Sequence, residues 1–124
     1  MNLKFETSIS ALDAGLPIPA LGCALRGDVL IAVPEGIYAA EIMYRESHHK
    51  ALVIYGTDPT FPELGKILAV KMYDAYDSYF GPHEPITIEL IKLIRSLEHY
   101  SSPELWTLER SHDDDTIMKL FKIV

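Results

Sequence analysis

Hydrophobic residues in the first half of the chain gather in short runs, the pattern expected of β-strands. Leu3–Phe5 alternates with polar neighbours and predicts a short strand. A short helix is expected over residues 9–14, with Ser8 as its N-cap. Longer runs of aliphatic and β-branched residues follow, separated by turn residues and by a polar loop at residues 45–50. They predict three strands of an antiparallel meander, over Val29–Val33, Ile37–Tyr44 and Ala51–Tyr55.

The segment Thr60–Gly81 has the spacing of an amphipathic helix. Thr60 and Glu63 form a capping box, and Pro62 falls in the first turn, where its missing N–H is not needed. Lys71 interrupts the apolar face of this segment. We therefore expect one long helix over this segment, ending at Gly81. Its apolar face consists of Leu64, Ile67, Leu68, Met72, Ala75 and Tyr79.

A second helix is expected over Ile86–Tyr100, where apolar residues recur every three or four positions. The segments Glu104–Arg110 and Thr116–Val124 predict a closing hairpin, with the acidic run His112–Asp115 at its turn. The expected order is β-α-β-β-β-α-α-β-β in a single domain over residues 1–124. This predicts the α+β class: a mainly antiparallel sheet, made of the meander and the C-terminal hairpin, with two long helices packed on one face.

Composition and charge exclude several classes of protein. The formal net charge is −7, so the chain is expected to avoid nucleic acid, whose phosphates repel an acidic surface. A single cysteine, Cys23, leaves no disulfide within the chain and indicates a reducing compartment. No apolar run reaches the roughly 18 residues that a membrane span needs, and the first residues do not resemble a signal peptide. We expect a cytoplasmic protein that binds neither membrane nor nucleic acid.

Several catalytic and nucleotide-binding motifs are missing from the sequence. It contains no glycine-rich dinucleotide loop, no P-loop and no nucleophile elbow, and one cysteine cannot form a cysteine zinc site. His48 and His49 are interpreted as part of a solvated loop. The acidic run at residues 112–115 is interpreted as a turn rather than a cation site. We therefore expect no metal and no cofactor.

Cationic and aromatic residues that depart from the core pattern are the candidate binding residues. Lys71 stands where a core residue is expected, and Tyr73 has no place in the core of its helix. A basic stripe on the second helix is unexpected in an acidic chain and suits a phosphate-bearing ligand. The plainer alternatives are that Lys71 extends from the core edge to solvent, and that the stripe is a solvated helix face. The candidate ligand-binding residues are Lys71, Tyr73, Lys92, Arg95, His99 and Arg110.

The missing catalytic motifs and a surplus of apolar residues favour a non-catalytic binding protein that self-associates. One branch of this hypothesis is a small anionic, nucleotide-like ligand that the protein sequesters. The other is a basic protein partner, blocked in the manner of an inhibitor or immunity protein. A phage or a mobile element as the source would fit such a protein. The alternative is a small acid–base enzyme that uses His83, His99 or Lys71 with a nearby carboxylate. The sequence favours the interpretation without enzyme activity.

Overall fold

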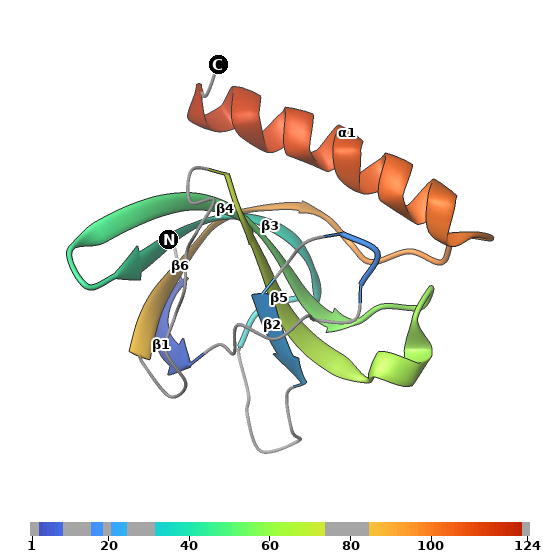
Figure 1. Ribbon diagram of the computed structural model, residues 1–124, viewed down its shortest axis with the longest axis horizontal. Helices are drawn as coiled ribbons and strands as arrows, with labels where there is room; N and C mark the ends of the chain where they lie inside the picture. The colour runs from blue at the N-terminus through green and yellow to red at the C-terminus, as the bar shows by residue number, and fades with distance from the viewer. Residues whose placement is uncertain (1–2, 9–15, 19–20, 25–31, 74–84, 123–124) are drawn as a thin grey trace.

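A curled sheet with a helix lying across it makes up the described part of the chain (Figure 1). The computed structural model of the protein describes residues 3–8, 16–18, 21–24, 32–73 and 85–122. The elements are β1 (Leu3–Ser8), β2 (Leu21–Ala24), β3 (Gly36–Tyr44), β4 (Ser47–Thr57), the 3₁₀ turn η1 (Pro62–Leu64), β5 (Lys66–Met72), β6 (Pro85–Arg95) and α1 (Pro103–Phe121). The six strands pair in the order β1-β6-β3-β4-β5-β2, and every neighbouring pair is antiparallel.

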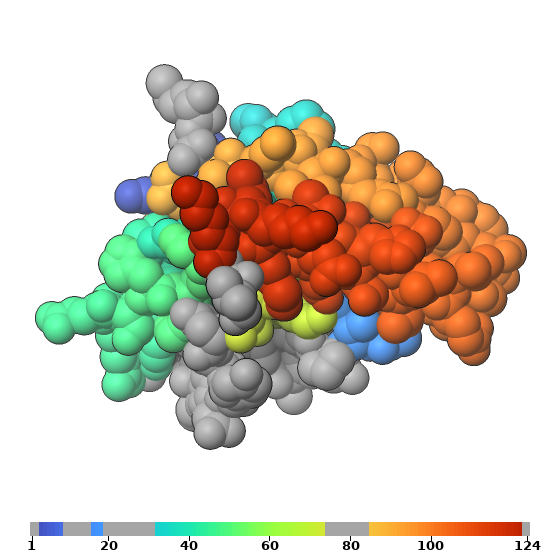
Figure 2. Space-filling model, turned by 90° about the horizontal axis from the view of Figure 1, so that it is seen from above, coloured from blue at the N-terminus to red at the C-terminus, as the bar shows by residue number. Residues whose placement is uncertain are grey.

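The sheet is buried on both faces, which explains the continuous runs of buried residues in its central strands. Alternate residues of β3 to β6 form an inner core within the curl. The intervening residues of β3 to β5 form an outer core beneath α1, which lies along this face beside β6 and the segment that follows it (Figure 2). The inner core comprises Tyr38, Ala40, Ile42, Ala51, Val53, Tyr55, Leu68, Val70, Ile86, Ile88 and Leu90. The outer core comprises Leu16, Ile18, Ile37, Ala39, Leu52, Ile54, Ile67, Ala69, Trp106 and Ile117.

Two β-bulges in β6 decide which side of the sheet its last residues face. Ile91 and Ile94 are each left without an opposite residue on β3, because the register shifts beside each of them. A bulge residue resets the alternation of its strand. Lys92 and Arg95 therefore face the side of α1, and Leu93 faces the inside of the curl. In a regular strand the lysine would face the inner core instead.

The segment Thr60–Gly81 forms no long helix in its described part, so the first expected helix is wrong. Pro62 opens a single 3₁₀ turn, and this turn ends at Gly65, whose φ of +68° lies in the left-handed region that glycine adopts without steric cost. The chain then continues as β5. Four consecutive residues, Ile67–Val70, are buried because both faces of this strand are covered, and such a run contains helix-like spacings by chance. Residues 74–81 lie outside the described residues.

The second expected helix and the closing hairpin are also wrong, because each segment adopts the other type of structure. Residues 86–95 belong to β6, and the segment expected to form the hairpin is α1. Ser102 caps this helix: its hydroxyl accepts a hydrogen bond from the Leu105 N–H at 3.2 Å, and Pro103 occupies the first turn. The described chain is therefore mostly β with one helix, and the expected α+β class with two long helices packed on a sheet is incorrect.

The expectations for the first half of the chain agree better with the structure. The strand at Leu3–Phe5 and the antiparallel pairing of the segments at 37–44 and 51–55 are confirmed. The turn between them is shorter than expected, so His48 and His49 lie in β4. Residues 9–14 and 29–31 lie outside the described residues, and residues 32–33 are not in a strand. Within the described residues, no helix combines the length and the apolar composition needed to cross a membrane.

Candidate functional site

The buried face of α1 carries charge as well as apolar side chains. Its buried residues are Trp106, Arg110, Asp113 and Ile117, which recur at intervals of one helical turn. Arg110 Nε donates to Asp113 Oδ2 at 2.8 Å, within the same helix. Burial raises the pKa of the Asp113 carboxyl, although Arg110 and then Arg95 oppose the rise. The charges of Arg110 and Asp113 therefore compensate each other within the protein.

Arg95 joins this network from the end of β6. Its Nη1 atom lies 3.0 Å from Glu109 Oε2 and 3.5 Å from Asp113 Oδ1, and its Nη2 atom donates to the Tyr100 hydroxyl. The hydrogen bond from Arg95 is the main cause of a lowered pKa at Glu109. The guanidinium group is thus surrounded by acceptors that belong to the chain itself.

Lys71 and Tyr73 meet α1 nearer its C-terminal end, at Asp114. Lys71 Nζ lies 2.5 Å from Asp114 Oδ2, and the Tyr73 hydroxyl donates to Oδ1 at 2.7 Å. Burial, and then this hydrogen bond, raises the pKa of Tyr73, so the phenol keeps its proton and donates. Both residues lie on the outer face because they continue the alternation of Ile67 and Ala69 along β5. The carboxylate that they meet comes from the acidic run expected to form a turn.

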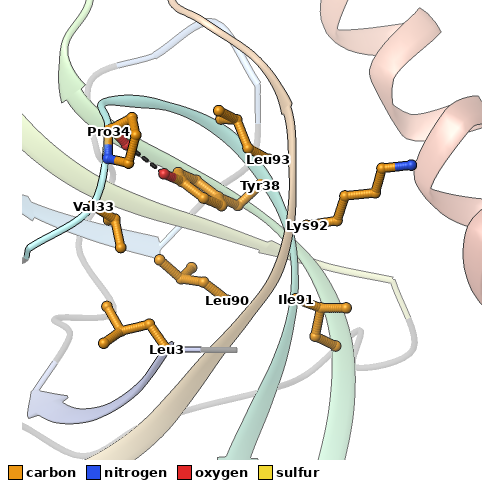
Figure 3. A pocket seen from close by; sticks show the side chains of 8 residues that line it. All are labelled: Leu3, Val33, Pro34, Tyr38, Leu90, Ile91, Lys92 and Leu93. Carbon is orange, nitrogen blue, oxygen red and sulfur yellow. Dashed lines mark hydrogen bonds between the residues drawn. The ribbon is translucent and has the colours of Figure 1, made fainter. Parts of the chain in front are cut away.

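The remaining two candidate binding residues, Lys92 and His99, are exposed. Lys92 extends from β6 toward α1 (Figure 3). His99 lies in the segment between β6 and α1. The other four candidates converge on α1, where each is bonded to an acidic or hydroxyl group of the chain. Ligand binding by the six residues stays a prediction. His83, which the acid–base alternative invoked, lies outside the described residues.

Asp58 is a buried carboxylate that was not among the sequence-based candidates. Its Oδ2 atom accepts a hydrogen bond from Trp106 Nε1 at 2.8 Å, and its Oδ1 atom accepts one from the Thr60 N–H at 2.9 Å. Phe61 packs edge-on against the same tryptophan, with ring centroids 5.3 Å apart. This segment therefore fixes the N-terminal half of α1 to the sheet. The one available signal was that aspartate in turns often bonds its own backbone two residues on.

An apolar pocket, which we call the Tyr38 pocket, opens at the end of the sheet where β3 begins and β6 ends (Figure 3). Its volume is about 240 Å³. The Tyr38 hydroxyl donates to the Pro34 carbonyl, which fixes the ring in the pocket, and burial raises the pKa of Tyr38. Figure 3 shows the Lys92 side chain extending away from the other lining residues. The lining residues are Leu3, Val33, Pro34, Tyr38, Leu90, Ile91, Lys92 and Leu93.

Charged residues lie at the same end of the sheet as the Tyr38 pocket. Glu35 Oε1 accepts a hydrogen bond from the Thr57 N–H at 2.8 Å, and Glu35 Oε2 lies 3.9 Å from Lys66 Nζ. Gly56 has φ +124°, and a Cβ atom there would lie 2.3 Å from Glu35 Oε1. The glycine is therefore needed both for its backbone conformation and for the close approach of the glutamate.

A further polar cluster, formed by Glu41, His48 and Lys50, lies toward the β3–β4 turn. Glu41 Oε1 lies 2.5 Å from His48 Nδ1, and Glu41 Oε2 lies 2.5 Å from Lys50 Nζ. These hydrogen bonds, from Lys50 first and His48 second, lower the pKa of Glu41. The same lysine ammonium lies 4.9 Å from the Phe121 ring at the end of α1. Across the part of the chain that the structure describes, no group of three or more His, Cys, Asp or Glu side chains is placed to hold a metal ion.

Comparison with known protein families identifies a family for most of the chain. A flavokinase family model, described as riboflavin kinase, matches residues 10–121. The chain belongs to the riboflavin kinase family. The match extends from before β2 to the end of α1. In this riboflavin kinase family member it therefore includes the charged residues Arg95, Arg110 and Asp113 and most of the Tyr38 pocket.

Membership of the riboflavin kinase family corrects the functional expectations. A kinase is an enzyme, so the predictions of a non-catalytic binding protein and of no enzyme activity are wrong. The roles of inhibitor and of sequestering protein are wrong for the same reason. Phosphoryl transfer relies on positioning and on charge stabilisation more than on covalent chemistry. The absence of a P-loop and of a glycine-rich dinucleotide loop therefore excludes only the nucleotide-binding folds that contain those loops.

One solved structure extends the comparison for this member of the riboflavin kinase family. The crystal structure of a macrolide-efflux protein from Streptococcus pneumoniae resembles it with a TM-score of 0.69 over 93% of this chain. The sequences are 16% identical, so the likeness concerns the fold alone. The present chain corresponds to 36% of that chain. A search of curated proteins gave no match.

Proposed function

We propose that the protein is a riboflavin kinase that transfers the γ-phosphoryl group of ATP to the terminal hydroxyl of the ribityl chain of riboflavin. The observation that carries this proposal is the family match over residues 10–121. In this reaction the hydroxyl oxygen forms a bond to the γ-phosphorus, and the bond from that phosphorus to the bridging oxygen of ADP breaks. The hydroxyl proton passes to a base or to solvent. The products are riboflavin 5′-phosphate and ADP.

The end of the sheet that holds the Tyr38 pocket has the chemistry that both substrates need, and we place them there. Riboflavin presents an extended ring system with a carbon edge, for which the pocket offers apolar walls. ATP brings negative charge and Mg²⁺, for which Lys66 offers a cation and Glu35 a carboxylate. A hydrogen bond with Tyr55 is the main cause of a raised pKa at Lys66, which therefore stays protonated. Mg²⁺ in kinase sites is held by substrate phosphates and one or two carboxylates, so no closed cage of protein ligands is required.

The proposal keeps the sequence-based expectations that remain untested. A cytoplasmic location suits an enzyme that consumes ATP. Self-association stays a prediction, and neither nucleic acid nor a membrane has a role in the reaction. Lys92 and His99 are the exposed members of the candidate binding set, and we keep them as secondary positions for phosphate contact.

The test is direct turnover. The purified protein is incubated with riboflavin, ATP and Mg²⁺, and the flavins and nucleotides are separated by chromatography. We expect riboflavin 5′-phosphate and ADP to appear in equal amounts, and to disappear when a chelator removes Mg²⁺. ADP release without flavin phosphate would identify water or another acceptor and would contradict the proposal. A folded protein that forms neither product would contradict it as well.

A further inference from the structure

The side chains that line the Tyr38 pocket offer carbon and no free polar group. The Tyr38 hydroxyl already donates its hydrogen bond to the Pro34 carbonyl, and Lys92 extends toward α1 (Figure 3). The other lining residues are aliphatic. A ligand group with donors or acceptors on its edge would find no side-chain partner here and would have only backbone groups to replace its hydrogen bonds to water. The pocket therefore favours a group whose edge is made of carbon.

The size of the pocket limits how much of a ligand enters it. Its volume of about 240 Å³ exceeds that of an apolar cavity of about 150 Å³ that binds benzene. It falls below the roughly 300–1,000 Å³ typical of a pocket that encloses a whole drug-sized ligand. One substituted benzene ring fits these limits, whereas a complete riboflavin molecule does not.

Resting on the riboflavin kinase function proposed above, we propose that the Tyr38 pocket takes the dimethylbenzene edge of the riboflavin ring system. This edge is a flat carbon ring with two methyl groups and no donor or acceptor. The opposite edge of the flavin carries carbonyl and N–H groups. The adenine of ATP carries ring nitrogens and an amino group. Both of those edges would find no free polar side chain in this pocket, so we place them elsewhere.

The bulge at Ile91 is what makes the pocket apolar. Because it resets the alternation of β6, Leu93 turns to the inside opposite Tyr38, while Lys92 turns to the side of α1. A regular strand would have placed the lysine in the pocket wall. Leu93 is 41% exposed, so it forms the rim of the pocket and is not needed to fill the inner core.

Equilibrium binding of two flavins tests the assignment. Riboflavin and an analogue that lacks both ring methyl groups are titrated separately, and quenching of flavin fluorescence reports the affinity. Burial of two methyl groups predicts that the wild-type protein binds riboflavin on the order of tenfold more tightly than the analogue. Adenosine is expected not to displace riboflavin. Displacement by adenosine, or equal affinities for the two flavins, would overturn the assignment.

Two serine variants locate the effect within the molecule. Leu93→Ser at the rim is expected to weaken riboflavin binding and to bring the affinities for the two flavins together. Leu108→Ser is the matched control, because Leu108 is 51% exposed and lies on α1, away from the pocket. It is expected to keep the tenfold difference, and thermal unfolding checks that both variants fold. Unchanged discrimination in Leu93→Ser would overturn the assignment.

These outcomes are distinguishable from failure of the proposed function. If the wild-type protein phosphorylates both flavins but binds them equally, the kinase function stands and the pocket assignment falls. If it binds neither flavin and forms no product, both fall.

Discussion

Lys71 and Tyr73 share one carboxylate, that of Asp114 on α1. The ammonium group takes one oxygen and the phenol takes the other, so both polar side chains are bonded on the face of the sheet that α1 covers. These two residues depart from the apolar pattern of their segment because their partner, on a helix, lies 43 and 41 positions farther along the chain. A polar residue at a core position can therefore mark where another element docks.

Replacing Asp114 by asparagine is expected to destabilise the fold. The ion pair with Lys71 would be lost, and the side chains are only 28% and 13% exposed, so we expect a loss of about 1–2 kcal/mol, between the values of exposed and buried pairs. Asp115→Asn removes the same charge from the exposed neighbouring position and serves as the control. Urea unfolding measures both. Equal effects of the two substitutions would show that general charge, not this contact, matters.

Replacing Trp106 by phenylalanine tests the attachment of α1 at its N-terminal half. The substitution removes the Nε1 donor and leaves one oxygen of the buried Asp58 without its partner. An unpaired buried acceptor costs about 1–3 kcal/mol. Leu108→Ala, at an exposed position on the same helix, is expected to change the free energy of unfolding by less than about 0.5 kcal/mol. A phenylalanine variant as stable as the wild type would show that this hydrogen bond does not stabilise the fold.

The stability of the protein at acid pH is expected to depend on Glu41. Its pKa is lowered in the folded state, so the unfolded chain takes up this proton first as the pH falls. The stabilisation is therefore complete above the ordinary value of 4.5 and is lost as the pH falls through the lowered folded value. Glu41→Gln should flatten this part of the curve, whereas Glu46→Gln in the exposed turn should not. Urea midpoints measured between about pH 5 and pH 3 give the comparison, and parallel curves for wild type and Glu41→Gln would refute the prediction.

Lys66→Ala is expected to lower kcat/KM for ATP in the kinase reaction. Loss of a cation that faces the transferred phosphate typically costs roughly tenfold or more in rate. Lys119→Ala removes an exposed lysine from α1 and is expected to leave the rate unchanged. Steady-state kinetics with both variants gives the answer. A Lys66→Ala enzyme with wild-type kinetics would place the phosphates elsewhere.

Self-association, expected from the surplus of apolar residues, remains to be measured. A homo-oligomer should show a mass above that of one 14.0 kDa chain, and the mass should rise with concentration. Size-exclusion chromatography with light scattering at two concentrations is sufficient. A constant mass of one chain at the higher concentration would contradict the prediction.

Two of the three expected strands of the meander could be predicted because their pattern is local. β3 and β4 are runs of apolar and β-branched residues separated by a short polar turn, and their pairing follows from that turn. β6 also carried a readable signal, since Ile86, Ile88 and Leu90 alternate with less buried residues. The same residues include a helix-like i, i+4 spacing, at Ile86 and Leu90, so the pattern fits a helix as well as a strand.

The helix could not be identified from its apolar pattern, because the middle of its buried face is charged. Arg110 and Asp113 lie between Trp106 and Ile117, so the apolar stripe is interrupted where it should be strongest. The capping residues do not show which segment forms the helix either. Proline and glutamate follow a hydroxyl residue both at Thr60 and at Ser102, and only the second site begins an α-helix.

The candidate site was partly visible in the sequence. Four of the six candidate residues do converge on one interface. The α1 carboxylates that accept hydrogen bonds from Arg95 and Lys71 lie 14 and 43 positions away, which no local pattern reveals. The Tyr38 pocket was invisible, because it depends on register shifts between β3 and β6. Such shifts are set by the pairing of strands and not by either strand alone.

The bulges of β6 also set how this strand can change in length. Deleting Ile91 would leave Leu90 followed directly by Lys92, and ordinary alternation would keep both side chains on the sides they now occupy. Deleting a paired residue away from a bulge would instead exchange inside and outside for the positions between it and the next bulge. Deletions in β6 are therefore expected to be tolerated best at or beside Ile91 and Ile94.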